Sequence, residues 1–206
     1  DDNFVSMVGG VEEGRVAYDN IRKVTWLLIS TGIAEITLFV LSFAFNMPLP
    51  LGAVQLLWLN LVTQGIQDVA LAFEKGEPGV LDRPPRSPDE PIFDRRMVER
   101  AIFSDMIMGC TAFAVFAYFI NVLGWNEFDA RNGLLLLMVF FENVHVFNCR
   151  SETRSVLRIP LSANPLLITT VFAAQGVHLA AMHLPVFRDI LGVQPVSPAV
   201  WFGLLL

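Results

Sequence analysis

The sequence predicts an all-α fold: a polytopic membrane helical bundle of about six transmembrane helices. Hydrophobic residues make up 54% of the 206 residues and charged residues 17%, whereas a soluble domain has about 45–50% and about 25%. The mean hydropathy is +0.54. The apolar residues are gathered in runs of about 20, which is the length that a helix needs to cross a bilayer.

Residues 1–23 are predicted to form a cytoplasmic stalk. Val11, Val16 and Ile21 have helical spacing, and charged residues interrupt them. We expect this segment to continue into the first span as one long helix that projects by about 1.5 Å per residue. The chain begins without a leader and ends within an apolar run, so it is expected to be a piece of a longer protein.

The transmembrane domain is predicted to cover residues 24–206. The expected helices are about 24–45, 51–73, 101–123, 133–149 and 163–184, and a last, truncated helix at 196–206. Pro, Gly, Asn and charged residues fill the segments between them, as is typical of loops. Cys110 and Cys149 lie in or at the end of apolar runs, which indicates buried, reduced thiols.

The basic residues predict the orientation of these spans. Twelve of the 14 Lys and Arg residues lie before the first span, in the 74–100 loop, or between the fourth and fifth spans. Arg131 and Arg188 lie on the opposite side. By the positive-inside rule, the N-terminus and the 74–100 loop are cytoplasmic. We expect a plasma or inner membrane protein that contacts lipid, with no nucleic-acid partner.

Two carboxylates at membrane depth are the first candidate functional residues. A charge near the bilayer centre costs at least about 2.5–3.5 kcal/mol. Glu35 lies about 16 Å into the first span, and Glu142 is near the middle of the fourth. No Lys or Arg lies within a predicted span to neutralise them. They are therefore expected to be protonated or to share a cation.

The second span carries the densest group of polar residues. Asn60, Thr63 and Gln64 are three and four positions apart, so they share one helix face near mid-membrane. Asp68 continues this stripe, and it either belongs to the site or reaches the cytoplasmic interface. Carboxylate, amide and hydroxyl oxygens suit hard cations. A nearby Gly65, like Gly32 in the first span, would permit a distorted helix whose freed carbonyls also face the site.

Other polar residues in the spans are interpreted without a metal. Asp105, near the start of the third span, is expected at the solvated interface. His145, His178 and His183 are expected to hydrogen-bond between helices, because transmembrane packing uses such residues in this way.

Several stretches resemble P-type cation-transporting ATPases of the calcium and sodium-potassium pump branch. In this chain, "DDNFVSMVGGVEEGRVAYDNIRK" resembles the junction between the phosphorylation domain and the fifth membrane helix of that family. The stretch "LPLGAVQLLWLNLVTQG" resembles its sixth helix. The stretch "DRPPRSPDEPIF" is similar to the loop that follows the sixth helix, and "FFENVHVFN" is similar to the eighth helix. This resemblance covers the whole chain. It implies a block of six membrane helices, the fifth to the tenth, with the tenth truncated.

The resemblance also implies ligands. Glu35 matches the fifth-helix glutamate that ligates calcium, and Glu142 matches the eighth-helix glutamate. Asn60 and Thr63 match two sixth-helix residues that contribute side-chain oxygens.

Two positions depart from the pattern of that family. Gly32 stands where the fifth helix has asparagine, and Gln64 stands where the sixth helix has the aspartate shared by two calcium sites. Because affinity for hard divalent ions depends on charge count, we expect a single site, or a less charged ion such as sodium or a proton. Asp68 would supply charge about 6 Å closer to the cytoplasm. The predicted metal-site residues are Glu35, Asn60, Thr63, Gln64, Asp68 and Glu142.

The chemistry of ATP hydrolysis is expected outside this chain. The "DKTGT", "TGD" and "GDGxND" motifs of the family do not occur in it. The resemblance implies that ATP and Mg²⁺ bind actuator, phosphorylation and nucleotide domains elsewhere in the full-length protein, which also has further N-terminal helices. We expect no catalytic residue and no resident cofactor in this chain, only a transported cation, calcium or a monovalent ion.

Two other functions are compatible with the same residues. A gradient-driven secondary transporter or channel-like bundle would use the acids as a proton or sodium relay. A structural membrane bundle would use the polar residues only to pair helices.

Overall fold

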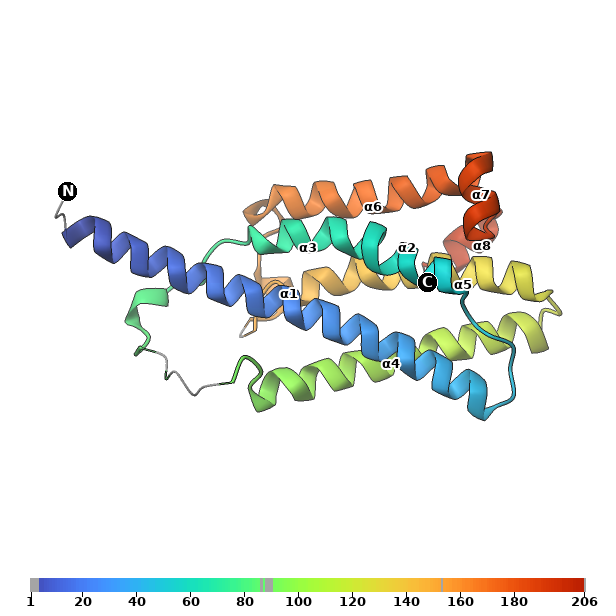
Figure 1. Cartoon of the computed structure of the whole chain (residues 1–206), viewed down its shortest axis with the longest axis horizontal. Helices are drawn as coiled ribbons and strands as arrows, with labels where there is room; N and C mark the ends of the chain where they lie inside the picture. Colours follow the sequence, from blue (N-terminus) through green and yellow to red (C-terminus); the bar gives the residue numbers. More distant parts are fainter. Residues whose placement is uncertain (1–3, 86, 88–90, 153, 206) are drawn as a thin grey trace.

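The computed structural model describes residues 4–85, 87, 91–152 and 154–205, and the regular structure among them is helical. Arg86 of the basic loop and residues 1–3 of the stalk lie outside the described residues. Figure 1 shows a bundle of helices in which the N-terminal helix extends well past the ends of the others. The all-α prediction is therefore confirmed for the described part of the chain.

The stalk and the first span form one helix, as predicted. α1 comprises Phe4–Ala44, 41 residues, and is about 60 Å long at 1.5 Å per residue. It ends where Asn46 takes a left-handed conformation with φ of 53°. The Met47 amide then donates to the Ser42 carbonyl at 2.8 Å. A left-handed residue followed by this wider hydrogen bond is a common way to end a helix.

The second predicted span has the expected extent, but its winding changes in the middle. It consists of α2 (Ala53–Trp58), a π-helical turn (Leu59–Thr63) and α3 (Gln64–Ala72). π-turns are rare and occur frequently at functional sites. This is the helical distortion expected near Gly65. The distortion expected near Gly32 does not occur, because α1 remains α-helical there.

Three further long helices begin at a side chain that caps them. They are α4 (Arg95–Asn121), α5 (Glu127–Asn148) and α6 (Pro165–His183), capped by Asp94, Asn126 and Asn164. Each cap accepts a hydrogen bond from a backbone amide of the first turn. α4 and α5 begin six residues before the predicted limits because their polar first turns are helical although they are not apolar.

The last part of the chain differs more from the prediction. α7 (Pro185–Leu191) lies in a segment that was expected to be a loop. α8 (Pro198–Gly203) covers only part of the predicted 196–206 helix. Short 3₁₀ turns lie at Val80–Asp82, Val156–Arg158 and Leu161–Ala163.

Three of the described helices are long and apolar enough to cross a membrane. They are Phe4–Ala44, Met97–Asn121 within α4, and Pro165–His183. Length and composition thus confirm a helical membrane protein with several candidate spans. The prediction of six spans goes beyond this finding.

α1 and α4 pack against each other and approach closely at Gly109. A Cβ atom at this position would lie 2.6 Å from the Cβ of Thr37 and 2.7 Å from the Ala34 carbonyl oxygen. A residue without a side chain is therefore required at this crossing, as at many contacts between transmembrane helices.

Two apolar clusters fill the interior, and a polar layer separates them. One cluster includes Leu38 of α1, Leu59 of the π-helical turn and Leu135 of α5. The other includes Leu27 of α1, Leu71 of α3 and Val146 of α5. The polar stretches Ser30–Glu35, Asn60–Asp68 and Glu142–His145 lie between these positions. At the same level, apolar side chains face outward: Val144 is 64% exposed, whereas its neighbours Asn143 and His145 are buried. Such a polar interior with an apolar exterior suits a bilayer.

The two cysteines are free thiols, as predicted. Cys149 is buried, but Cys110 is exposed on the outer surface of α4. The prediction that both thiols are buried is thus wrong for Cys110.

Candidate cation site

The structure joins Glu35 of α1 to Asn60 of the π-helical turn. The Asn60 amide nitrogen donates to both carboxylate oxygens of Glu35, at 3.1 and 3.3 Å, and to the Leu56 carbonyl at 2.9 Å. Both residues are half-buried. The Asn60 side-chain oxygen accepts none of these hydrogen bonds, so it is an available oxygen ligand beside a carboxylate.

A second pair joins the same turn to α5. The Thr63 hydroxyl lies 2.5 Å from Oε2 of Glu142 and 2.8 Å from the Leu59 carbonyl oxygen. Thr63 is 0% exposed and Glu142 is 1% exposed. A hydroxyl has one hydrogen to donate, so it satisfies one of these two acceptors at a time. The other acceptor then lacks a donor within this contact.

Gln64 and Asp68 follow these pairs along the chain, toward the end of α3. The Gln64 amide donates to the Thr31 hydroxyl of α1 at 2.7 Å. The Oε1 of Gln64 and the Oδ1 of Asp68 are buried and have no hydrogen-bond partner among the described residues. Asp68 and Glu35 are both near enough to Glu142 for their charges to interact with it. Asp68 is thus near the carboxylates, but it makes no hydrogen bond with Glu35 or Glu142.

A chain of amides extends from the same helix face to α6, and the predicted site did not include it. Gln67 donates to Asn143 at 2.6 Å, and Asn143 donates to Gln175 of α6 at 2.9 Å. Gln67 is 0% exposed. Its spacing of three residues from Gln64 was the only sequence signal, and its partners could not be inferred without the packing of α5 and α6.

Two histidines hydrogen-bond between helices, as predicted. Nε2 of His145 lies 2.6 Å from the Ser30 hydroxyl of α1, and Trp58 donates to Nδ1 of His178 at 3.1 Å. His183 differs, because it is exposed at the end of α6. Within the described part of the chain, no group of three or more His, Cys, Asp or Glu side chains is arranged to hold a metal ion.

The expectation that Asp105 is solvated is wrong. Asp105 is 0% exposed, and its Oδ1 accepts a hydrogen bond from Ser104 at 3.2 Å. The reason is that α4 begins at Arg95, ten residues earlier. Asp105 therefore lies well within the helix, one turn from the crossing at Gly109.

The helix ends nearest the stalk are joined by ion pairs that were not predicted from the sequence. Arg150, after α5, contacts Glu74, after α3, at 2.8 Å, and both side chains are buried. Arg22 of α1 contacts Glu152 at 2.8 Å. The sequence shows that each of these charged residues lies close to an apolar run, but it does not show which residue pairs with which.

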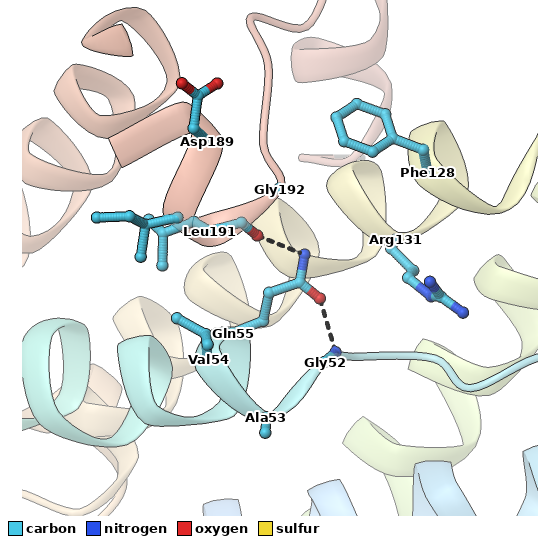
Figure 2. A pocket seen from close by; sticks show the side chains of 10 residues that line it. Gly52, Ala53, Val54, Gln55, Phe128, Arg131, Asp189, Leu191 and Gly192 are labelled. Atoms are coloured by element: carbon cyan, nitrogen blue, oxygen red, sulfur yellow. Dashed lines mark hydrogen bonds between the residues drawn. The ribbon is translucent and has the colours of Figure 1, made fainter. Parts of the chain in front are cut away.

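A surface pocket of about 320 Å³ lies at the other end of the bundle (Figure 2). Its wall is closed by Gln55, whose oxygen accepts from the Gly52 amide and whose nitrogen donates to the Leu191 carbonyl. None of the six predicted metal-site residues, all within the described part of the chain, lines it. The polar layer and this pocket are thus separate features.

Comparison with known proteins agrees with the resemblance. Residues 48–206 match the family model described as "Cation transporting ATPase, C-terminus". The chain belongs to this family. It corresponds to the C-terminal membrane domain of P-type cation-transporting ATPases, which confirms the resemblance seen in the sequence.

Relatives of this ATPase domain align along nearly its whole length. It is 34% identical over 203 residues to "Probable cation-transporting ATPase F" of Mycobacterium tuberculosis (strain ATCC 25618 / H37Rv), which covers 98% of this chain and 22% of the relative. It is 31% identical over 201 residues to "Calcium-transporting ATPase" of Bacillus subtilis (strain 168), with the same coverage. With "Calcium-transporting ATPase type 2C member 2" of Mus musculus it shares 30% over 198 residues, 96% of this chain and 21% of the relative. The chain therefore spans about a fifth of the length of these relatives.

Proposed function

We propose that this ATPase domain is the membrane part of an ATP-driven cation pump and holds one mid-membrane cation site. The observation that carries the proposal is the pair of contacts Glu35–Asn60 and Thr63–Glu142. They gather carboxylate, amide and hydroxyl oxygens from three separate helices in the polar layer. These are the donor atoms that hard cations prefer.

Unpartnered oxygen atoms support a cation in this layer. Gln64 Oε1 and Asp68 Oδ1 accept no hydrogen bond from the described residues. A buried acceptor without a partner costs about 1–3 kcal/mol. A cation coordinated by these oxygens would offset that cost. We therefore propose Gln64 and Asp68 as ligands along with Glu35, Asn60, Thr63 and Glu142.

The charge of the site favours one ion over two. The proposed ligands include three carboxylates, Glu35, Asp68 and Glu142, whose combined charge is smaller than that of two divalent ions, and Gln64 contributes a neutral amide. The names of two relatives specify calcium, which makes calcium the first ion to test. A monovalent ion, sodium or a proton, requires less ligand charge, and we propose it as the second.

We propose alternating access as the mechanism. Phosphorylation in a domain outside this chain would tilt α1 by its projecting stalk, which is continuous with the segment that carries Glu35. The π-helical turn, with its widened hydrogen-bond pattern, would adjust the positions of Asn60 and Thr63. Such movements would change the distances among the oxygens, lower the affinity and open the site to the other side.

The proposal includes the six-span topology with a cytoplasmic N-terminus and 74–100 loop, in a plasma or inner membrane. Two segments would add to the three long apolar helices, which makes five spans, and the sixth would be the predicted span at 196–206, of which α8 covers only a part. The second segment has 20 residues from Ala53 to Ala72, and α5 has 22. Both lengths are sufficient to cross a bilayer.

The test uses the full-length protein in membranes. Phosphoenzyme formation from ATP is measured while calcium, and separately sodium or pH, is varied. We expect a cation-dependent phosphoenzyme that Glu35→Gln and Asn60→Ala abolish or shift to higher cation concentration. A protein that transports a cation along its gradient but forms no phosphoenzyme would instead be a secondary transporter.

A further inference from the structure

Glu74 is the centre of a buried polar cluster at the cytoplasmic end of the helix that carries Asn60, Thr63 and Gln64. Its carboxylate accepts two hydrogen bonds from Arg150, at 3.0 Å from Nε and 2.8 Å from Nη2. The Arg150 side chain is 0% exposed and that of Glu74 is 5% exposed. This two-bond geometry fixes the relative position of both groups, because a guanidinium and a carboxylate meet edge to edge.

Two asparagines extend the cluster to other helices. Asn164, the cap of α6, donates to the Glu74 carboxylate at 2.9 Å and to the Ala70 carbonyl at 3.0 Å. Asn20 of α1 donates to the carbonyls of Ala72 and Glu74, at 3.0 and 2.7 Å. The Ala72 carbonyl lies at the end of α3 and the Glu74 carbonyl just past it, where the helix itself offers no donor. Both asparagines are 4% exposed.

The cluster therefore joins the three helices that carry the proposed ligands. Asn20 is 15 residues before Glu35 on α1, Glu74 lies two residues after α3 ends, and Arg150 lies two residues after α5 ends. Arg150 follows Glu142 by eight residues, which is about 12 Å of helix. Uninterrupted α-helix connects Asn20 with Glu35. An axial shift at the cluster is thus transmitted to the ligand positions.

We propose that Glu74 is a positioning residue for the cation site: with Arg150, Asn164 and Asn20 it sets the axial positions of α1, α3 and α5 relative to one another. This inference rests on the proposed function, because it concerns the affinity of that same site. A buried ion pair is often replaced by apolar residues without loss of stability. The contribution of this cluster is therefore expected in the geometry of the site as well as in folding.

The experiment compares Glu74→Gln and Arg150→Leu with the doubly substituted Glu74→Leu/Arg150→Leu in the full-length protein. The matched control is Glu99→Gln, because Glu99 forms an exposed pair with Arg95 on the same side, at 2.7 Å with side chains 60% and 91% exposed. The cation concentration for half-maximal phosphoenzyme is measured with calcium and with sodium, beside the maximal phosphoenzyme level.

We expect Glu74→Gln and the double variant to raise the half-maximal cation concentration roughly three- to thirtyfold, as substitutions within coupled networks do, with the maximal level unchanged. Glu99→Gln is expected to leave both quantities unchanged. If the single variants do not fold, the double variant decides, because it removes both charges of the Glu74–Arg150 pair together. A double variant that folds and has wild-type cation affinity overturns the proposal. A wild-type protein without any cation-dependent phosphoenzyme would refute the proposed function, and with it the site that Glu74 is proposed to position.

Discussion

The Thr63 hydroxyl lies 2.5 Å from Oε2 of Glu142, although 79 residues separate them in the sequence. The contact is fully buried between the π-helical turn and α5. The threonine hydroxyl supplies the hydrogen between the two oxygen atoms. A cation that took both oxygen atoms as ligands would replace this hydrogen bond.

Thr63→Val should weaken cation binding while the protein stays folded. Valine has nearly the shape of threonine but no oxygen, so one ligand is lost and Glu142 loses its neighbour. We expect a loss of cation affinity of about 10–100-fold, as for other residues that orient metal ligands, measured as the half-maximal cation concentration for phosphorylation. Thr169→Val is the control, because Thr169 is exposed on α6. Equal affinities in the two variants would contradict the assignment of Thr63.

Gln64→Asp should favour calcium over sodium. The substitution places a carboxylate beside Thr31 where an amide now lies, and affinity for a hard divalent ion rises with ligand charge. We expect the ratio of calcium affinity to sodium affinity to increase at least about tenfold, which corresponds to about 1.4 kcal/mol. Gln64→Asn, which keeps the amide but shortens the side chain, is the control. An unchanged ratio would show that Gln64 does not contact the ion.

Asp68→Asn tests whether the acid one turn from Gln64, on the side that is proposed to be cytoplasmic, contributes charge to the site. The substitution keeps the shape and removes the negative charge. If Asp68 is a ligand, calcium affinity should fall by more than sodium affinity, because the divalent ion depends more strongly on charge. A variant with wild-type affinity for both ions would instead place Asp68 outside the site.

Gly109→Ala should destabilise the bundle. The new Cβ would lie 2.7 Å from the Ala34 carbonyl oxygen, and backbone atoms cannot move away as a flexible side chain can. Overpacking of this kind costs about 1–3 kcal/mol. The measurement is the temperature at which half of the detergent-solubilised protein loses its monodisperse form. Gly176→Ala, where nothing lies within 4 Å of the new atom, is expected to leave this temperature unchanged or raise it.

The proposed topology can be tested with single cysteines in a Cys110→Ser background. Leu81→Cys lies in the 74–100 loop and Leu123→Cys in the loop between α4 and α5, and both positions are exposed. A thiol reagent that cannot cross the membrane should label position 123 in intact cells and position 81 only after the cells are opened. The reverse pattern would contradict a cytoplasmic N-terminus.

The helical class and several contacts of the candidate site could be anticipated from the sequence, because both depend on patterns within one segment. Runs of apolar residues indicate spans, and a glutamate or asparagine within such a run is conspicuous. Asn60 and Glu35 were identified in this way, and the structure brings them together. The continuity of α1 likewise followed from local helical spacing.

The remaining features depend on how the helices rotate and pack, which no single segment reveals. The position of Asp105 follows from where Asp94 caps α4. The partner of Gln67 is Asn143, 76 residues away, and Glu74 meets Arg150 at the same separation. The π-helical turn also escaped prediction in detail, because Gly65 permits a distortion without specifying its form.

The most direct test of the single cation site is transport by the full-length protein reconstituted in vesicles, with cation uptake and ATP hydrolysis measured together. We expect one cation per ATP, and no cation-dependent transport when both carboxylates are removed in Glu35→Gln/Glu142→Gln. Uptake of two calcium ions per ATP, or undiminished transport by the double variant, would contradict it.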